Sequence, residues 1–159
     1  MEDMITSCKQ NAVRGMERFL KTLSFVPDDK LTWSPSPTAK TPLRIAAHTA
    51  LMAGNFAQLI RHGKFPPMDM AQLFAALNAA EEAITTREAV IELFKKNTDD
   101  VLAALDTATP EQIASTVETP FGFSAPMAMF MSAPGIHAQN HAAQIDYLQT
   151  CWGDQDPHF

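Results

Sequence analysis

The chain has 159 residues, of which 46% are hydrophobic and 19% charged, a balance typical of a soluble globular domain with a full core. Its formal net charge of -6 argues against nonspecific binding to nucleic acid or to anionic membranes. Two cysteines, Cys8 and Cys151, and an acidic N-terminus without a signal-peptide pattern predict reduced thiols and a cytoplasmic location. We therefore expect one domain, with neither a membrane nor a nucleic-acid partner.

The first third of the chain predicts two helices separated by a loop. Apolar residues recur at helical spacing over residues 4–25, which predicts the first helix. Residues 26–41 contain three prolines and several Ser and Thr, and they predict a long loop. The second helix is expected over residues 42–62. Thr41 would cap it, a proline stands at its first position, and Gly63 would end it.

The middle of the chain predicts one more long helix. Residues 69–82 are compatible with a short extra helix. Thr85 with Glu88 three residues on fits a capping box, and the helix it opens should run to about residue 105. Residues 107–124 are then expected to form a second long connection, because nothing in them supports the pair of strands that would be the alternative.

The last helix should begin at residues 124–126 and end near residues 152–153. Pro134 and Gly135 interrupt it, so we expect a kink or bulge there. The bend would either let the helix follow its core or aim His137, and the sequence favours neither interpretation. Four main helices without convincing strands predict an all-α bundle.

Three histidines form the candidate site. His137 and His141 are four residues apart and therefore leave the last helix on the same side. His48 lies in the middle of the second helix, and if the two helices pack side by side, the three imidazoles can hold a divalent metal ion. Three neutral ligands leave the ion its charge and an open position, as in catalytic sites. The alternative is a metal-free core cluster whose rings bond to Gln144, Asn55 or backbone carbonyls.

Other candidates carry less information. No HExxH and no Glu-x-x-His occurs, which excludes the zincin and di-iron carboxylate patterns. Gln144 could orient a ligand ring or be an ordinary buried polar residue. Arg44 and Asn55 are candidates for positioning a substrate, although an arginine there would more often pair with a surface carboxylate. His62, at a helix end, is expected to complement the helix dipole.

Three stretches of the sequence together resemble the motifs of a known protein family. The first is LTWSPSP at residues 31–37, followed by Thr41, Pro42 and His48. The second is TPFG at residues 119–122, and the third is HxxxHxxQ from His137, continued by Ile-Asp-Tyr-Leu. Over nearly the whole chain these features resemble the DinB-like, or YfiT-like, superfamily of metal-binding four-helix bundles. The proline and glycine just before His137 depart from a regular helix at the first ligand of the pair.

The resemblance implies an up-down-down-up four-helix bundle with long connections, formed as a single DinB-like domain over residues 1–159. It implies His48, His137 and His141 as metal ligands, with zinc or nickel as the usual ion and water completing its shell. Characterised bacterial relatives include metal-dependent S-transferases and isomerases that use bacillithiol, mycothiol or glutathione. Many relatives are homodimers, and the family name does not imply DNA binding.

We therefore expect a metal-dependent enzyme with a small-molecule substrate. The metal would bind a small thiol as thiolate, and the sulfur would attack an electrophilic substrate. A hydrolase, in which activated water is the nucleophile, would use the same site. Two further alternatives remain: a metal-binding bundle without catalytic activity, with a structural or stress-related role, and an interaction bundle without metal. Beyond the ligands, the sequence predicts no catalytic residue.

Overall fold

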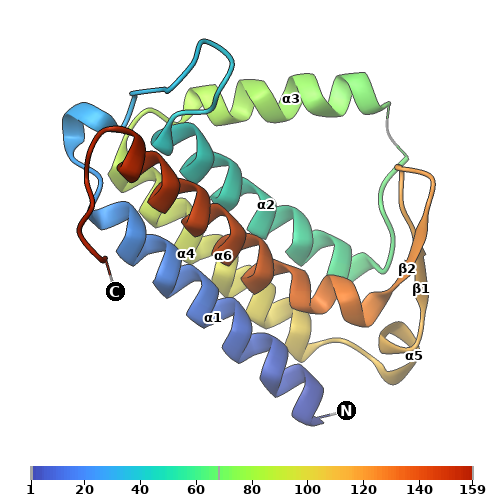
Figure 1. The fold of residues 1–159 in the computed structure, drawn as a ribbon. Helices are drawn as coiled ribbons and strands as arrows, with labels where there is room; N and C mark the ends of the chain where they lie inside the picture. The colour runs from blue at the N-terminus through green and yellow to red at the C-terminus, as the bar shows by residue number, and fades with distance from the viewer. Residues whose placement is uncertain (1, 68, 159) are drawn as a thin grey trace.

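The computed structural model describes residues 2–67 and 69–158. Its body consists of four long helices, which are α1 (Glu2–Ser24), α2 (Pro42–His62), α4 (Arg87–Asp106) and α6 (Met127–Cys151). Helices α1 and α6 run in one direction, and α2 and α4 run in the other (Figure 1). The expected up-down-down-up bundle is confirmed. No helix in the two described ranges is both long and apolar enough to cross a membrane.

The connection between α2 and α4 shapes the site described below. These two helices are parallel neighbours, so the chain must return along the bundle between them. It does so through α3 (Met70–Ala83), which crosses the outside of the bundle (Figure 1, green). The short extra helix expected near residues 69–82 is therefore present, and it is the crossover element.

Local capping fixes the beginning and end of α2 as expected. The Thr41 hydroxyl accepts a hydrogen bond from the backbone N–H of Arg44 at 3.1 Å, and Pro42 follows it. Gly63 ends the helix in the left-handed conformation, with φ of 71°. Before α2, the Leu31 carbonyl accepts from the Leu43 N–H at 3.0 Å, which holds the preceding loop, including a short 3-10 turn at Asp28–Lys30, against the helix start.

The predicted capping box at the start of α4 is wrong by one residue. Thr86, not Thr85, is the cap, and its hydroxyl accepts from the backbone N–H of Ala89 at 3.2 Å. Thr86 has extended backbone angles, whereas Arg87 is already helical, so the cap geometry falls on the second threonine. Two adjacent threonines offer the same capping chemistry. Which threonine caps α4 depends on the position and direction in which the chain leaves α3.

The connection before α6 is more ordered than the sequence predicted. It contains α5 (Pro110–Ile113) and an antiparallel hairpin of β1 (Thr116–Glu118) and β2 (Ser124–Pro126). In each three-residue strand only the central residue points inward: Val117 and Ala125 face each other and are 1% and 6% exposed. Strands this short have no detectable alternation, which is why the prediction of a plain connection was wrong.

The Pro-Gly pair of α6 lies at a close contact between α6 and α1. The helix continues through Pro134 as one element, and its first turns run in a different direction from the rest (Figure 1, orange). A Cβ added to Gly135 would lie 2.3 Å from the backbone oxygen of Asn11, and one added to Gly15 would lie 2.7 Å from Gly135 Cα. Gly135 therefore has a packing role, because the backbones of α1 and α6 can come this close only if positions 15 and 135 carry no side chain.

This contact gives a stability prediction. Gly135→Ala is expected to lower the free energy of unfolding by about 3 kcal/mol, because both backbones must move apart to admit a methyl group. Urea unfolding followed by circular dichroism measures it. The control is Gly63→Ala, where nothing lies within 4 Å and only the positive φ opposes the change, at a cost of about 1 kcal/mol. Equal losses in the two variants would contradict the close-contact interpretation.

Small residues are buried on both α2 and α6. Alanines at positions 46, 47, 50, 53 and 57 of α2 are at most 4% exposed, and so are Ala138 and Ala142 of α6. The separation of packed helices depends on the side chains between them, so alanines allow a close approach. Each histidine of α6 directly precedes one of these alanines. The packing of α2 against α6 places His48 opposite His137 and His141.

Candidate metal centre

The three histidines converge at the contact between α2 and α6. His48 comes from α2, and His137 and His141 come from successive turns of α6. One ring nitrogen from each lies within 4.8 Å of the other two. The ring centroids are 4.3 to 5.3 Å apart, and Nε2 of His137 lies 3.1 Å from Nε2 of His141. Three imidazoles thus surround one point.

This donor set fits a divalent metal ion. Two nitrogens that each lie 2.0–2.1 Å from one tetrahedral ion are about 3.4 Å apart, close to the separation between His137 and His141. Imidazole nitrogens suit zinc and nickel. Among the described residues, no carboxylate or cysteine joins the three histidines in this cluster. Three protein ligands leave at least one coordination position for a water molecule or a substrate atom.

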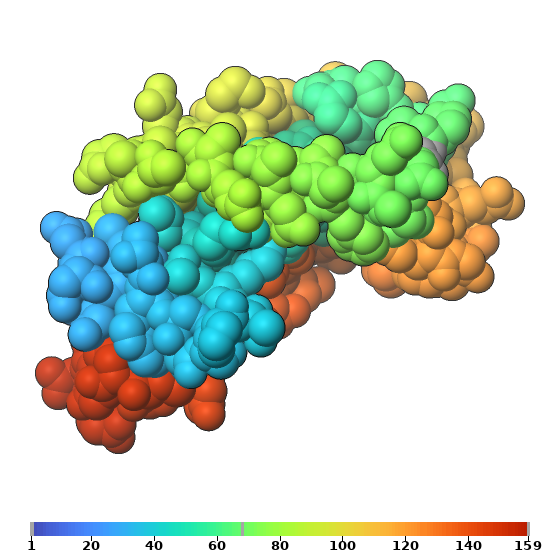
Figure 2. All heavy atoms as spheres, turned by 90° about the horizontal axis from the view of Figure 1, so that it is seen from above, coloured from blue at the N-terminus to red at the C-terminus, as the bar shows by residue number. Residues whose placement is uncertain are grey.

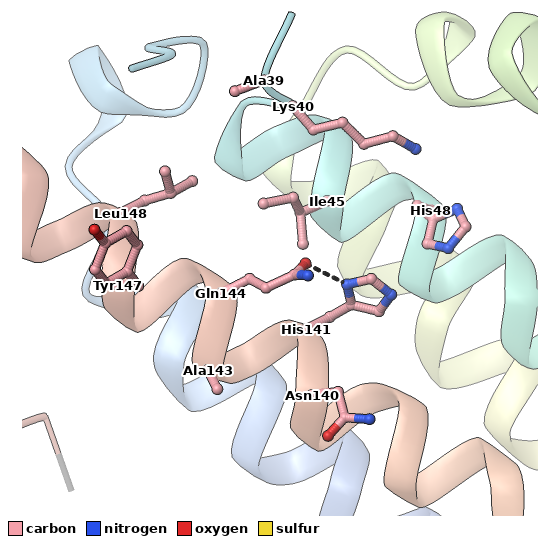
Figure 3. A pocket seen from close by; sticks show the side chains of 10 residues that line it. All are labelled: Ala39, Lys40, Ile45, His48, Asn140, His141, Ala143, Gln144, Tyr147 and Leu148. Carbon is pink, nitrogen blue, oxygen red and sulfur yellow. Dashed lines mark hydrogen bonds between the residues drawn. The ribbon is translucent and has the colours of Figure 1, made fainter. Parts of the chain in front are cut away.

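Hydrogen bonds at Nδ1 orient two of the rings. Nδ1 of His48 lies 2.8 Å from Oε1 of Glu81, and Nδ1 of His141 lies 2.7 Å from Oε1 of Gln144 (Figure 3). A carboxylate or amide oxygen accepts the Nδ1–H, so each ring keeps its Nε2 lone pair for a metal. Gln144 thus lies in the position that the sequence analysis considered for an orienting partner.

Glu81 is a residue of the site that the sequence analysis missed. Its side chain is 2% exposed, and Lys40 Nζ lies 2.8 and 2.7 Å from its two oxygens. Burial alone would raise the pKa of Glu81, but hydrogen bonds from Lys40, His48 and Arg44 outweigh it and lower that pKa. The carboxylate is therefore ionised and can accept the Nδ1–H of His48. One signal was available: Glu81 and Glu82 are the only charged residues of α3.

The other sequence candidates lie around the centre. Arg44 donates to Glu81 at 3.1 Å and to Glu82 at 3.0 Å, and so joins α2 to α3. Asn55 is exposed, with its amide 3.5 Å from the sulfur of Met52, and it lines one of the two cavities beside His48. His62 pairs with Gln58 within its own helix, at 3.2 Å.

The histidine pair of α6 is neutral at neutral pH. Burial lowers the pKa of His137 to about 3, and the neighbouring His141 and His48 add to the effect. Burial also lowers the pKa of His141, although its bond to Gln144 opposes the shift. Neutral rings offer their lone pairs without first losing a proton, which favours metal binding.

The lowered pKa of His137 predicts acid sensitivity of the metal-free protein. An unfolded histidine titrates near 6.5, so below that pH the unfolded state binds a proton that folded His137 rejects until pH reaches about 3. Stability is therefore fully present above pH 6.5. It should fall by about 1.4 kcal/mol per pH unit below it. Urea unfolding of chelator-treated protein at pH 7 and pH 5 should show this loss, and His137→Gln should reduce it.

Two cavities meet at His48. One, of about 640 Å³, lies toward the start of α2. Its lining is mixed, with the polar residues Lys40, Asn140, His141 and Gln144 beside apolar ones such as Ile45 and Leu148 (Figure 3). The other, of about 860 Å³, lies toward the end of α2 and is lined mainly by apolar residues. We call them the polar cavity and the aromatic cavity. A molecule in either one would lie next to the histidine cluster.

Comparison with known proteins agrees with this architecture. The family model described as the DinB superfamily matches residues 12–145. No curated protein matches the chain in sequence. Among solved structures, YfiT from Bacillus subtilis, described as a probable metal-dependent hydrolase with an unusual four-helix bundle topology, superposes with a TM-score of 0.74 and 14% identity over 96% of this chain and 90% of its own.

Two further structures share the fold. The DinB-like protein YjoA from Bacillus subtilis has a TM-score of 0.66 and 13% identity, with 96% of each chain covered. The mycothiol-dependent maleylpyruvate isomerase has a TM-score of 0.70 and 14% identity, covering 89% of this chain and 60% of the isomerase. At these identities the likeness is one of fold.

Proposed function

This chain belongs to the DinB superfamily, and on that premise we propose that it is a metal-dependent enzyme that transfers a low-molecular-weight thiol to an electrophilic substrate. The observation that carries the proposal is the convergence of His48, His137 and His141 at the junction of two cavities. The fold shared with a mycothiol-dependent isomerase supports it. We propose zinc or nickel as the ion, because both accept three imidazole ligands.

A divalent ion held by the three Nε2 atoms would lower the pKa of a thiol placed at its open position. The protein's own residues then have distinct tasks. Glu81 and Gln144 hold the rings of His48 and His141 with Nε2 toward the centre. Lys40, whose ammonium is bound by Glu81, borders the polar cavity together with Asn140. These polar groups suit a hydrophilic thiol.

The reaction balances without a redox partner. The thiol proton goes to solvent, which reaches the site through the open polar cavity. The sulfur electron pair forms a new bond to the electrophilic carbon, and the leaving group departs with the electron pair of the bond that breaks. We assign no general base on this chain, because the one buried carboxylate beside the cluster is already bonded to three cations or donors.

The test is a spectroscopic and kinetic comparison on cobalt- and zinc-loaded protein. Adding glutathione, bacillithiol or mycothiol to the cobalt form should produce a sulfur-to-cobalt charge-transfer band with one of them. The zinc form should then conjugate the same thiol to 1-chloro-2,4-dinitrobenzene or another reactive electrophile. His141→Ala should lose both signals. His158→Ala should keep them, because His158 pairs with Asp154 and lines neither cavity. Metal-loaded protein that gives neither signal with any thiol would overturn the proposal.

Hydrolysis is the second candidate, because a three-ligand centre also has room for water and YfiT is described as a probable metal-dependent hydrolase. The same preparations tested with p-nitrophenyl esters in the absence of thiol separate the two. Ester cleavage that depends on metal and not on thiol would favour the hydrolase. Bound metal without either activity would favour a bundle whose metal is structural.

A further inference from the structure

The aromatic cavity is lined by phenylalanines from separate parts of the chain. Phe56 is on α2, Phe65 follows α2, Phe74 is on α3, Phe121 is in the hairpin turn and Phe130 is on α6. Seen from above, the surface is hollowed between α3 (green) and the hairpin with the start of α6 (orange) (Figure 2). The volume of about 860 Å³ falls within the range of small-molecule sites, roughly 300–1,000 Å³.

The lining of the aromatic cavity is mainly apolar. Apart from His48, its only ionisable residues are His62 and Lys64. Phe74 and Phe121 are 54% and 58% exposed, so large apolar surfaces remain in water at the mouth of the cavity. Exposed apolar surface of this kind, gathered in a hollow, marks a binding site. An apolar ligand would cover these rings and gain the free energy of their removal from water.

The position of the cavity relates it to the histidine cluster. His48 lines both this cavity and the polar cavity, and the ring of Phe56 packs edge-on against His137 at 5.6 Å between centroids. A molecule lying along the phenylalanines therefore has one end beside the centre. The polar cavity on the other side of His48 remains free for a second, hydrophilic molecule.

We propose that the aromatic cavity holds the apolar body of the electrophilic substrate, a small molecule with an aliphatic or aromatic chain whose reactive carbon lies beside His48. The inference rests on the proposed function and adds the substrate class to it. The thiol approaches from the polar cavity, so the two reactants meet at the centre from opposite sides. A hollow walled by α2, α3 and the hairpin suits a small molecule better than a flat helix face does.

The first test measures binding and needs no catalysis. The neutral fluorescent probe N-phenyl-1-naphthylamine should bind to zinc-loaded and to chelator-treated protein, and n-alkanols should displace it. Each added methylene from hexanol to decanol should tighten displacement about fourfold, the effect of burying one CH₂ group. Phe74→Asp should weaken probe binding about tenfold or more, because it places a charge in the apolar lining. Phe25→Asp is the control, since Phe25 is 37% exposed, lies outside the lining and stacks on His158 at the other end of the bundle.

Three results would overturn the inference. One is an absence of saturable probe binding, and another is an equal effect of the two aspartate variants. The third is probe binding that weakens with rising protein concentration, together with a dimer that Phe74→Asp dissociates in sedimentation, because a second copy of the chain would then cover the cavity. Failure of the metal or thiol experiments with intact probe binding would overturn the proposed function and the role of the bound molecule as its substrate, but would leave the aromatic cavity as an apolar binding site.

Discussion

Alanine in place of His141 should abolish the binding of one equivalent of zinc or nickel. The substitution removes one of three ligand nitrogens that lie within 4.8 Å of one another, and leaves a pair that cannot surround the ion. Loss of an outer partner of a ligand already weakens metal binding 10–100-fold, so loss of a ligand should weaken it by at least about a hundredfold. Plasma mass spectrometry after dialysis, followed by titration against a chromophoric chelator, measures stoichiometry and affinity.

The control for His141→Ala is His62→Ala. His62 is an exposed histidine of α2 that pairs with Gln58 at 3.2 Å, outside the cluster. The His62→Ala substitution should leave the metal content unchanged. Circular dichroism should show that both the His141→Ala and the His62→Ala variants remain helical. Wild-type protein that binds no metal after incubation with zinc, while folded, would show that the three histidines are a core cluster. Equal metal content in wild type and His141→Ala would place the metal elsewhere.

Glu81→Gln should weaken zinc binding 10–100-fold, because the amide cannot supply the negative charge that the Nδ1–H of His48 now faces at 2.8 Å. It should also lower the free energy of unfolding by about 2 kcal/mol, since Lys40 and Arg44 lose a shared carboxylate. This figure is below the usual cost of breaking a buried pair because those two side chains are 40% and 29% exposed and water can solvate them.

Glu82→Gln provides a matched control for the Glu81 experiment. Glu82 is the next residue of α3, 66% exposed, and pairs with Arg44 at 3.0 Å without reaching a histidine. It should change stability by less than about 0.5 kcal/mol and leave zinc affinity unchanged. The visible spectrum of the cobalt form separates positioning from stability, because a rotated His48 would alter it in Glu81→Gln. If the cobalt spectrum and the zinc affinity of Glu81→Gln were unaltered, Glu81 would act only as an ion-pair partner of Lys40 and Arg44 and would not orient His48.

Local patterns in the sequence predicted the helices because their causes are local. Helical spacing of apolar residues, the Thr41 cap and Gly63 are set within a few residues, and the structure has the corresponding helices. The four-residue spacing of His137 and His141 placed both rings on one side of α6 for the same reason. The packing of α2 against α6 then brought His48 to the same point.

The contacts that complete the site depend on tertiary structure. Glu81 is 33 residues from His48 in sequence and reaches it only because α3 crosses back over the bundle. The aromatic cavity joins side chains of α2, α3, the hairpin turn and α6, and no local pattern relates them. The hairpin itself depends on two inward side chains, Val117 and Ala125, whose partners are distant in the chain.

The amino-acid sequence by itself determined the four long helices, the family and the identity of the three candidate ligands. The tertiary structure decided which Nδ1 partners orient the rings, that Arg44 pairs with α3, and that two unlike cavities open on His48. The physical reason is the separation in sequence of the residues that interact. Helix formation and capping act between residues three or four apart, whereas the polar partners and cavity walls arise only where packed helices bring distant side chains together.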